Sequence, residues 1–259
     1  MNPVLDQILS RYASIAVAYS GGVDSAVLME ATHRSRGDCS FAVLADSPSL
    51  PRKEFESAVA LAKSQKWNLV VIQTEEFQDA RYMENPSNRC YFCKSALFEK
   101  MDRFAIDRQV EALAYGENAD DALEERWGRK AASEFKVIAP LREAGFTKSQ
   151  VRALAREWNL PVAEKVASPC LSSRVQTGIP ITSDSLIRIE KGEEFLGELG
   201  FRIRRVRFDG KTARVMVSEN ELPELLKTDK KNRVIDFLNE IGFEKIEISE
   251  EPYRGASLR

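Results

Sequence analysis

Six residues, Ser20-Gly21-Gly22-Val23-Asp24-Ser25, constrain the fold of this chain more than any other stretch. An apolar run from Ile15 to Tyr19 precedes them, and apolar residues at helical spacing follow as far as Ala31. This pattern predicts a strand, a glycine turn and the N-terminus of a helix. Glycine lacks a Cβ atom, so backbone N–H groups can approach an anion closely, and the helix N-terminus adds positive potential. The sequence therefore predicts an anion-binding loop.

The side chains of this loop favour a nucleotide over a bare phosphate. Ser20 and Ser25 supply hydroxyl donors, whereas the carboxylate of Asp24 repels a phosphate. We expect Asp24 either to cap the helix or to bind the Mg²⁺ that accompanies a nucleotide. The chain contains no G-x-x-x-x-G-K-[ST], so the loop is not a Walker A motif. It resembles the PP-loop of the ATP pyrophosphatases, and an ordinary capped glycine turn is the alternative.

Strands and helices alternate along the first two thirds of the chain. Strands are expected at 15–19, 40–45, 69–73, 112–115 and 137–139, and helices at 3–11, 23–36, 51–66, from after Lys94 to about Ile106, and at 148–158. The alternation predicts an α/β fold with a doubly wound parallel sheet and right-handed crossovers. Asp46 ends the second strand, where such sheets bind ligands, so it joins Ser20, Gly21, Gly22, Asp24 and Ser25 as an expected ATP-binding residue.

A second, smaller domain is expected after this sheet. Small and turn-forming residues from Ala167 to Arg174 end the alternating pattern, and we place the linker near 175–180. Helices are expected at 183–199, 219–227 and 230–241, and strands at 203–208, 212–217 and 244–248. Asp209-Gly210 between two strands is a hairpin signal. The sequence thus predicts a PP-loop domain at 1–177 and an α+β domain at 178–259.

Composition limits the compartment and the partners. Hydrophobic residues make up 43% and charged residues 30%, as in soluble globular proteins, and no apolar run approaches the roughly 20 residues of a membrane span. The N-terminus has no signal-peptide pattern, so we expect a reducing cytoplasm. The net charge of −2 argues against extended nucleic-acid binding, although six basic residues crowd positions 202–214. A lone histidine, His33, makes Ser-His or Cys-His catalysis unexpected.

The four cysteines are unequally placed. Cys90 and Cys93 form a C-x-x-C, which taken alone is compatible with a redox, zinc or structural role. Cys170 follows a proline in the small-residue loop, and Cys39 opens a strand, where we expect it to be buried. Three thiolates leave a four-sulfur zinc site incomplete, but they can hold a [4Fe–4S] cluster with one iron open. A structural knuckle with an incidental thiol at Cys170 is the alternative.

Several motifs together resemble the LarE family of ATP-dependent sulfur transferases, which help to build the nickel-pincer nucleotide cofactor. Besides the glycine loop they are Cys90-Tyr91-Phe92-Cys93-Lys94, Gly116-Glu117-Asn118-Ala119-Asp120-Asp121, Pro140-Leu141, Gly145-x-x-Lys148, Ser168-Pro169-Cys170-Leu171-Ser172-Ser173-Arg174 and Arg205-Val206-Arg207. The resemblance covers nearly the whole chain, and the motif around Cys170 is its most diagnostic part. The runs from Ala122 to Gly128 and from Val175 to Gly178 differ from the family's usual sequences.

The resemblance implies a reaction and its cofactors. ATP adenylates one carboxylate of a pyridinium-3,5-biscarboxylic acid mononucleotide, and sulfur then replaces AMP. Some members take sulfur from the cysteine at the position of Cys170, whereas others resemble cluster-dependent transferases. Cys90 and Cys93 place this chain in the second group, which implies ATP, Mg²⁺ and a [4Fe–4S] cluster on Cys90, Cys93 and Cys170. It also implies partner proteins of cofactor biosynthesis and a homo-oligomer, a hexamer, with contacts through the C-terminal domain.

Five further residues are candidates for substrate binding. Arg174, Arg205 and Arg207 are expected to clamp a phosphate or carboxylate through bidentate hydrogen bonds. The ring of Tyr91 is expected to face the pyridinium, and Glu193, at an acidic position of the family, to contact substrate or a metal ion. Solvated surface charges, and core packing for Tyr91, are the alternatives.

Three other functions fit part of the sequence. A PP-loop tRNA thiolase can also hold a cluster through a C-x-x-C and a third ligand, but the net charge disfavours tRNA. An amide-forming enzyme of the NAD synthetase type explains the glycine loop and leaves three cysteines without a role. A nucleotide- or metal-sensing binding protein without turnover is the non-enzymatic possibility.

Overall fold

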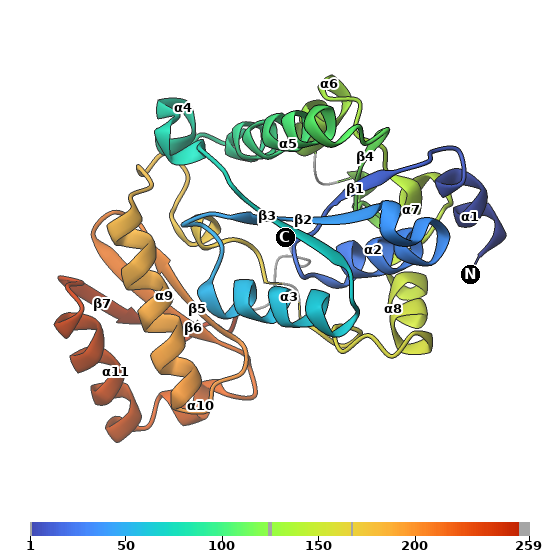
Figure 1. Cartoon of the computed structure of the whole chain (residues 1–259). Helices are drawn as coiled ribbons and strands as arrows, with labels where there is room; N and C mark the ends of the chain where they lie inside the picture. The colour runs from blue at the N-terminus through green and yellow to red at the C-terminus, as the bar shows by residue number, and fades with distance from the viewer. Residues whose placement is uncertain (1, 124–125, 167, 254–259) are drawn as a thin grey trace. The chain divides into compact units, whose positions relative to one another are not determined.

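The computed structural model describes residues 2–123, 126–166 and 168–253. By its internal contacts the chain separates into two units, Met1–Asp79 with Asn88–Ser168, and Ala80–Ser87 with Pro169–Arg259 (Figure 1). Glu124 and Glu125, in the run that departs from the family, and Ala167, which opens the loop before Cys170, lie outside the described residues. The domain boundary expected after residue 177 stays a prediction.

A parallel sheet forms the centre of the first unit. Its strands are β1 (Ile15–Ala18), β2 (Ser40–Asp46), β3 (Asn68–Gln73) and β4 (Ala112–Tyr115), in the order β3-β2-β1-β4 and all parallel. This confirms the α/β prediction. The strand expected at 137–139 is reduced to one residue, because Ile138 forms an isolated parallel bridge with Ala114 and Pro140 already begins a helix.

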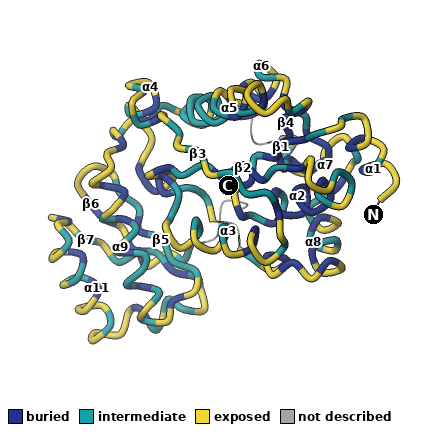
Figure 2. The backbone as a smooth tube through the Cα atoms, viewed as in Figure 1, coloured by how far each residue is buried: buried dark blue, intermediate teal, exposed yellow. Residues whose placement is uncertain are grey.

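Helices cover both faces of this sheet (Figure 1). They are α1 (Pro3–Leu9), α2 (Val23–Arg36), α3 (Arg52–Ser64), α5 (Arg89–Arg108), α6 (Arg126–Glu134), α7 (Pro140–Glu143) and α8 (Lys148–Glu157), with 3₁₀ turns η1 (Gly37–Cys39), η2 (Glu76–Gln78) and η3 (Asp120–Leu123). Successive strand residues point to opposite faces, so Val17 packs in one hydrophobic cluster with Leu28 of α2, and Ala16 in another with Phe98 of α5. Figure 2 shows β1 and β2 as buried backbone between these layers.

Two predictions about the cysteines are wrong at the level of local structure. The helix expected after Lys94 begins at Arg89, so it contains the whole C-x-x-C. Neither glycine nor proline interrupts residues 89–108, so nothing stops the helix from extending through them. Cys39 is exposed in the turn η1 rather than buried in a strand.

The second unit is a small α+β structure. Strands β5 (Arg204–Phe208) and β6 (Thr212–Val217) form the antiparallel hairpin predicted at Asp209-Gly210, and β7 (Lys245–Ile248) pairs with β6 in parallel. The helices are α4 (Ala80–Met83), α9 (Ser183–Glu198), α10 (Leu222–Leu225) and α11 (Thr228–Glu240), with a 3₁₀ turn η4 (Leu171–Arg174). Phe195 and Phe237 stack with ring centroids 4.1 Å apart and join α9 to α11.

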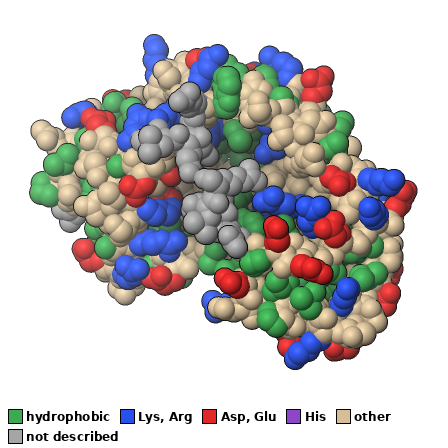
Figure 3. Space-filling model, turned by 180° about the vertical axis from the view of Figure 1, so that it is seen from behind, with side chains coloured by type: hydrophobic (Ala, Val, Ile, Leu, Met, Phe, Trp, Pro, Cys, Tyr) green, Lys and Arg blue, Asp and Glu red, His purple; other side chains and the backbone are tan. Residues whose placement is uncertain are grey.

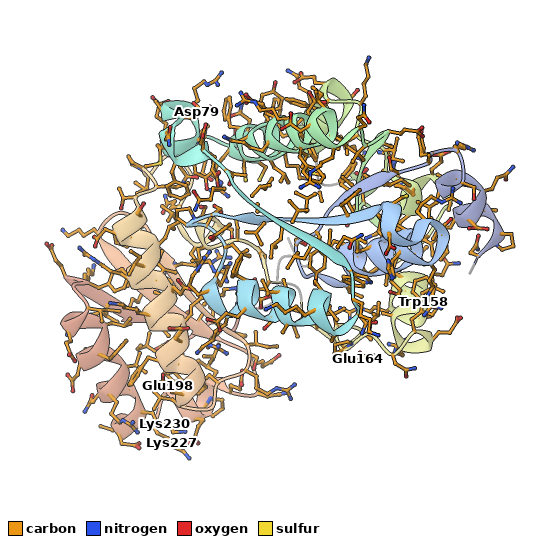
Figure 4. The ribbon with its side chains drawn as sticks, viewed as in Figure 1. Asp79, Trp158, Glu164, Glu198, Lys227 and Lys230 are labelled. Atoms are coloured by element: carbon orange, nitrogen blue, oxygen red, sulfur yellow. The ribbon has the colours of Figure 1, made fainter. Side chains whose placement is uncertain are left out.

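The surface of this unit carries exposed ion pairs. Figure 4 labels Lys227 and Lys230 at the start of α11, and both donate hydrogen bonds to Glu224. These bonds lower the pKa of the exposed Glu224 carboxyl to about 2. Exposed pairs of this kind add little to stability, so the buried contacts of the unit matter more.

One segment of the second unit comes from the middle of the sequence. Ala80–Ser87, within a stretch expected to be polar and irregular, packs against the residues that follow Cys170. The hydroxyl groups of Tyr82 and Ser172 are 2.7 Å apart, and both side chains are buried. The fully buried amide of Asn85 donates to the carbonyls of Gln176 and Ile179 at 2.8 and 2.9 Å. Long-range hydrogen bonds therefore fix both partners of this contact.

Gly116 provides a test of how the sheet meets the glycine loop. A Cβ atom at Gly116 would lie 2.7 Å from Ser25 N and 2.9 Å from Asp24 C, both backbone atoms. We expect Gly116→Ala to lower the free energy of unfolding by about 1–3 kcal/mol in urea titrations, because overpacking forces the backbone apart. The matched control is Gly128→Ala, whose Cβ would have as its nearest neighbours the atoms at the flexible end of Lys94. Equal losses in the two variants would contradict this explanation.

Candidate active site

The glycine loop presents the start of α2 to an anion. Gly21 has φ +72°, and a Cβ there would lie 2.7 Å from Ala58 Cβ of α3, so conformation and space both require glycine. Gly22 caps α2 without a side chain. The side chain of Ser25 stabilises the turn, because its Oγ accepts a hydrogen bond from Ser20 N at 3.1 Å and donates one to Gly22 O at 3.0 Å. A helix N-terminus shaped this way suits a phosphate.

Two lysines from distant parts of the first unit approach this loop. The ammonium of Lys148, at the start of α8, pairs with Asp24, and Asn118 Nδ2 donates to the same carboxylate at 3.1 Å. Lys165 Nζ donates to Gly21 O at 3.1 Å and pairs with Glu54 at 2.5 Å. They bring two ammonium groups, each paired with a carboxylate, to a loop that has no lysine or arginine of its own. Sequence reasoning noted Lys148 in a motif but gave it no role, and it gave no signal for Lys165.

Asp46 stands at the carboxyl edge of the same sheet. It ends β2, the strand beside β1, and Tyr19 N donates to Val43 O at 2.8 Å where the two strands run together. Its carboxylate pairs with Arg52 at 2.6 Å. The parallel sheet therefore brings Asp46 and the glycine loop to one edge, as expected, and its contact with ATP stays a prediction.

A buried carboxylate follows β4 at this edge. Glu117 is 5% exposed and accepts hydrogen bonds from Tyr115 Oη at 2.5 Å and Arg129 Nε at 2.5 Å, and it pairs with Arg142 at 2.8 Å. Burial raises the pKa of Glu117, but the bonds from Tyr115 and Arg129 and the charge of Arg142 outweigh burial, so the net pKa is lowered. Glu117 thus anchors α6 and α7 beside the loop. The sequence placed Glu117 in a motif of the family resemblance but gave it no role.

Cys90 and Cys93 lie one turn apart at the start of α5. Cys90 is exposed and Cys93 half-buried, and positions three apart share one helix face. A helix N-terminus stabilises thiolates. Between the two cysteines, Tyr91 donates its hydroxyl to Glu134 at 2.6 Å, and the ammonium of Lys130 lies 5.2 Å from its ring centroid. A cation of the chain thus already lies over this ring, and the expected pyridinium contact stays a prediction.

Arg174 organises the loop of Cys170 in the second unit. The residue is 3% exposed, and its guanidinium makes two 3.0 Å bonds to the carboxylate of Glu193. It also donates to the carbonyl oxygens of Pro169 and of Cys170, the latter at 2.9 Å. Glu193 in turn accepts from Val206 N at 3.1 Å. The structure thus brings two predicted substrate residues together as a buried pair beside Cys170, and their contact with substrate stays a prediction.

Arg205 and Arg207 share one face of β5. Their guanidinium groups lie 4.9 and 6.0 Å from the ring centroid of Tyr253, and both side chains are half-buried. Stacking on one aromatic ring orients two planar donors together, which suits a bidentate acceptor. On the face drawn in Figure 3, basic and acidic side chains are intermixed.

The described residues hold neither a ready-made metal cluster nor a membrane span. Within 2–123, 126–166 and 168–253, no three His, Cys, Asp or Glu side chains come together as a metal ion requires. Cys90 and Cys93 belong to the first unit and Cys170 to the second, so their convergence stays a prediction. None of the helices in the described part of the chain is long and apolar enough to cross a membrane.

Comparison with known proteins gives three informative relatives, and no protein-family model matches. An uncharacterised protein of Synechocystis is 32% identical over 254 residues, covering 98% of this chain and 95% of its own. The pyridinium-3,5-bisthiocarboxylic acid mononucleotide synthase of Lactiplantibacillus plantarum is 30% identical over 245 residues, covering 94% and 88%. One of the subunits of the glutamine-hydrolysing GMP synthase of Methanocaldococcus jannaschii is 30% identical over 169 residues, covering 61% and 53%.

The Glu117 network predicts a dependence of stability on pH. Because folding lowers the pKa of Glu117 below its ordinary 4.5, its contribution is complete above that value and is lost as pH falls through the folded pKa. We expect Glu117→Gln to lower the free energy of unfolding by about 1.5–3 kcal/mol at pH 7 in urea titrations. The difference in this free energy between the variant and wild type should become smaller below pH 4.5. Glu143→Gln, which breaks an exposed pair with Arg11, is the control and should change little. A gap that is constant down to about pH 3 would refute this role.

The Arg174–Glu193 pair predicts strong coupling between the two residues. Arg174→Met leaves a largely buried carboxylate without its cation and should lower the free energy of unfolding by about 3–5 kcal/mol. Adding Glu193→Leu removes that uncompensated charge and should restore part of the loss. A double variant as unstable as the sum of the single variants would show that the pair is not coupled.

Proposed function

Because the chain belongs to the LarE family, the family of the pyridinium-3,5-bisthiocarboxylic acid mononucleotide synthase, we propose that it is an ATP-dependent sulfur transferase. Its substrate is a pyridinium-3,5-biscarboxylic acid mononucleotide, and its product carries a thiocarboxylate. The single observation that carries the proposal is the match to that synthase over 94% of this chain, which spans both the glycine loop and the Cys170 loop.

The first unit is suited to the activation step. A carboxylate is a poor electrophile, so one of its oxygens attacks the α-phosphorus of ATP and pyrophosphate leaves with the electrons of the broken P–O bond. The N-terminus of α2, Lys148 and Lys165 provide the positive potential that binds the phosphates. The carboxylate of Asp24 is a hard oxygen ligand of the kind Mg²⁺ prefers, and Mg²⁺ bound there would neutralise the leaving pyrophosphate.

The transfer step requires a soft nucleophile. Sulfur attacks the carbonyl carbon of the acyl-adenylate, a C–S bond forms, and AMP leaves with the bridging oxygen. We propose that Cys90, Cys93 and Cys170 hold a [4Fe–4S] cluster that supplies this sulfur as an iron-bound sulfide. The donor set fits the group, because thiolates are the ligands of such clusters and two of them share one helical turn.

Chain connectivity is compatible with the proposed convergence of the three cysteines. Asn85 is hydrogen-bonded to the carbonyl of Gln176, six residues after Cys170, and Cys90 follows Asn85 by five residues. Five residues span at most about 18 Å, so the chain cannot carry Cys90 far from Asn85.

We further propose a cytoplasmic homo-oligomer that works with partner proteins of cofactor biosynthesis. Arg174, Arg205, Arg207 and Tyr91 are proposed to bind the substrate, and Glu193 to contact the substrate or a metal ion.

Anaerobic reconstitution with iron and sulfide tests the sulfur source. We expect a cluster absorbance in wild type and in Cys39→Ala, the control for an exposed cysteine, and its loss in Cys90→Ala, Cys93→Ala and Cys170→Ala. Pyrophosphate release should require the pyridinium carboxylate nucleotide. A protein mass lowered by one H₂S at Cys170 after turnover would instead assign the sulfur to that residue. Release stimulated by tRNA, or turnover dependent on ammonia, would refute the proposed substrate.

A further inference from the structure

Asp24 pairs with a cation of the chain at the place where the proposed function requires a metal ion. We propose that Lys148 occupies the metal position on Asp24 while no nucleotide is bound, and that its ammonium moves to the phosphates when magnesium nucleotide arrives. The inference rests on the proposed binding of ATP and extends it. It assigns to Lys148 two successive partners, Asp24 and then the nucleotide, and it makes Lys148 the competitor of the free metal ion.

The contacts of Asp24 show that both of its oxygens are in use. The Lys148 ammonium pairs with Oδ2, and Asn118 Nδ2 donates to Oδ1 at 3.1 Å. The side chain of Asp24 is only 20% exposed, so a carboxylate without a partner would be costly there. A divalent ion needs at least one of these oxygens. A divalent ion on Oδ2 would lie against the Lys148 ammonium, and these like charges repel each other, so the ammonium leaves, whereas the neutral amide of Asn118 can stay.

The backbone of Lys148 is held by hydrogen bonds, whereas its ammonium group is free to change position. Its backbone N–H donates to Asp120 Oδ2 at 2.7 Å, and Thr147 and Gln150 form a capping box around the start of α8. Its side chain is 37% exposed and carries the ammonium group on a flexible four-carbon stem. The base of the residue is thus fixed beside the glycine loop while the ammonium can change partners.

Lys165 shows a different arrangement. Its ammonium is shared between the carbonyl oxygen of Gly21 and the carboxylate of Glu54, at 3.1 and 2.5 Å. Both partners belong to the chain, and neither is the carboxylate that we assign to the metal ion. Lys165 therefore adds positive charge beside the loop without competing for Asp24, which makes it the matched control.

The exchange couples the metal ion to the nucleotide. Free Mg²⁺ must expel Lys148 and leave its ammonium without a counter-ion, so it binds weakly. Magnesium nucleotide brings a cation for Asp24 and an anion for Lys148 together, so both groups keep partners. Linkage of this kind requires that removing Lys148 change the affinities for the metal alone and for the metal nucleotide in opposite directions.

The experiment measures both affinities. Electron paramagnetic resonance follows Mn²⁺, a stand-in for Mg²⁺, without nucleotide, and calorimetry follows ATP with Mg²⁺. We expect Lys148→Met to bind Mn²⁺ alone about tenfold more tightly and magnesium ATP about tenfold more weakly. Lys165→Met should weaken magnesium ATP and leave Mn²⁺ unchanged. Lys148→Arg, which keeps the charge, should bind Mn²⁺ as weakly as wild type, and Asp24→Asn should abolish Mn²⁺ binding in every background, so that the EPR signal of free Mn²⁺ stays undiminished.

Three results would overturn the inference. They are an Mn²⁺ affinity in Lys148→Met equal to or below that of wild type, Mn²⁺ binding that survives Asp24→Asn, and wild-type protein that binds no magnesium ATP. If Lys148→Met does not fold, Lys148→Gln, which removes the charge and keeps most of the length, replaces it in the same measurements. Failure of the proposed function is distinct, because a protein that shows the opposite shifts but transfers no sulfur to the pyridinium nucleotide would leave the exchange intact.

Discussion

The close approach of the end of β4 to the first turn of α2 is the constraint on which the candidate active site depends. Gly116 leaves no room for a side chain against Ser25 N, so the backbone of one strand lies directly on the helix that presents the anion site. The loop after β4 consequently reaches Asp24 through Asn118, and Asp120 fixes the start of α8. The absence of a side chain at Gly116 thus allows the end of β4, the N-terminus of α2 and Lys148 to lie close together.

In the second unit, a buried ion pair stands beside Cys170, next to the fully buried side chain of Leu171. The guanidinium of Arg174 is nearly inaccessible, and its cost of burial is offset by Glu193 and by carbonyl acceptors of the loop. Because these bonds are directional, they fix the backbone that carries the thiol more closely than apolar packing would. The insertion of Tyr82 and Asn85 completes this support from the other side.

Much of the fold was predictable because its signals are local. Alternating and helical periodicities located the four parallel strands, the hairpin at Asp209-Gly210 and the capped helix that begins at Lys148. The failures have local causes too. The expected strand at 137–139 contributes only the bridge of Ile138, and the C-x-x-C was expected outside a helix although nothing in its sequence stops one.

The sequence by itself determined the glycine loop, the strands of the parallel sheet and the C-x-x-C, because each is specified by residue types at short spacing, and it singled out Cys170 by the residues around it. Only the tertiary structure decided which distant polar and charged side chains contact the glycine loop and the segment after Cys170. Lys148 reaches Asp24 across 124 positions, Lys165 reaches Gly21 across 144, and Asn85 reaches Gln176 across 91. Such contacts depend on how elements pack, and a lysine or asparagine looks alike in the sequence whether it is solvated or buried against a partner.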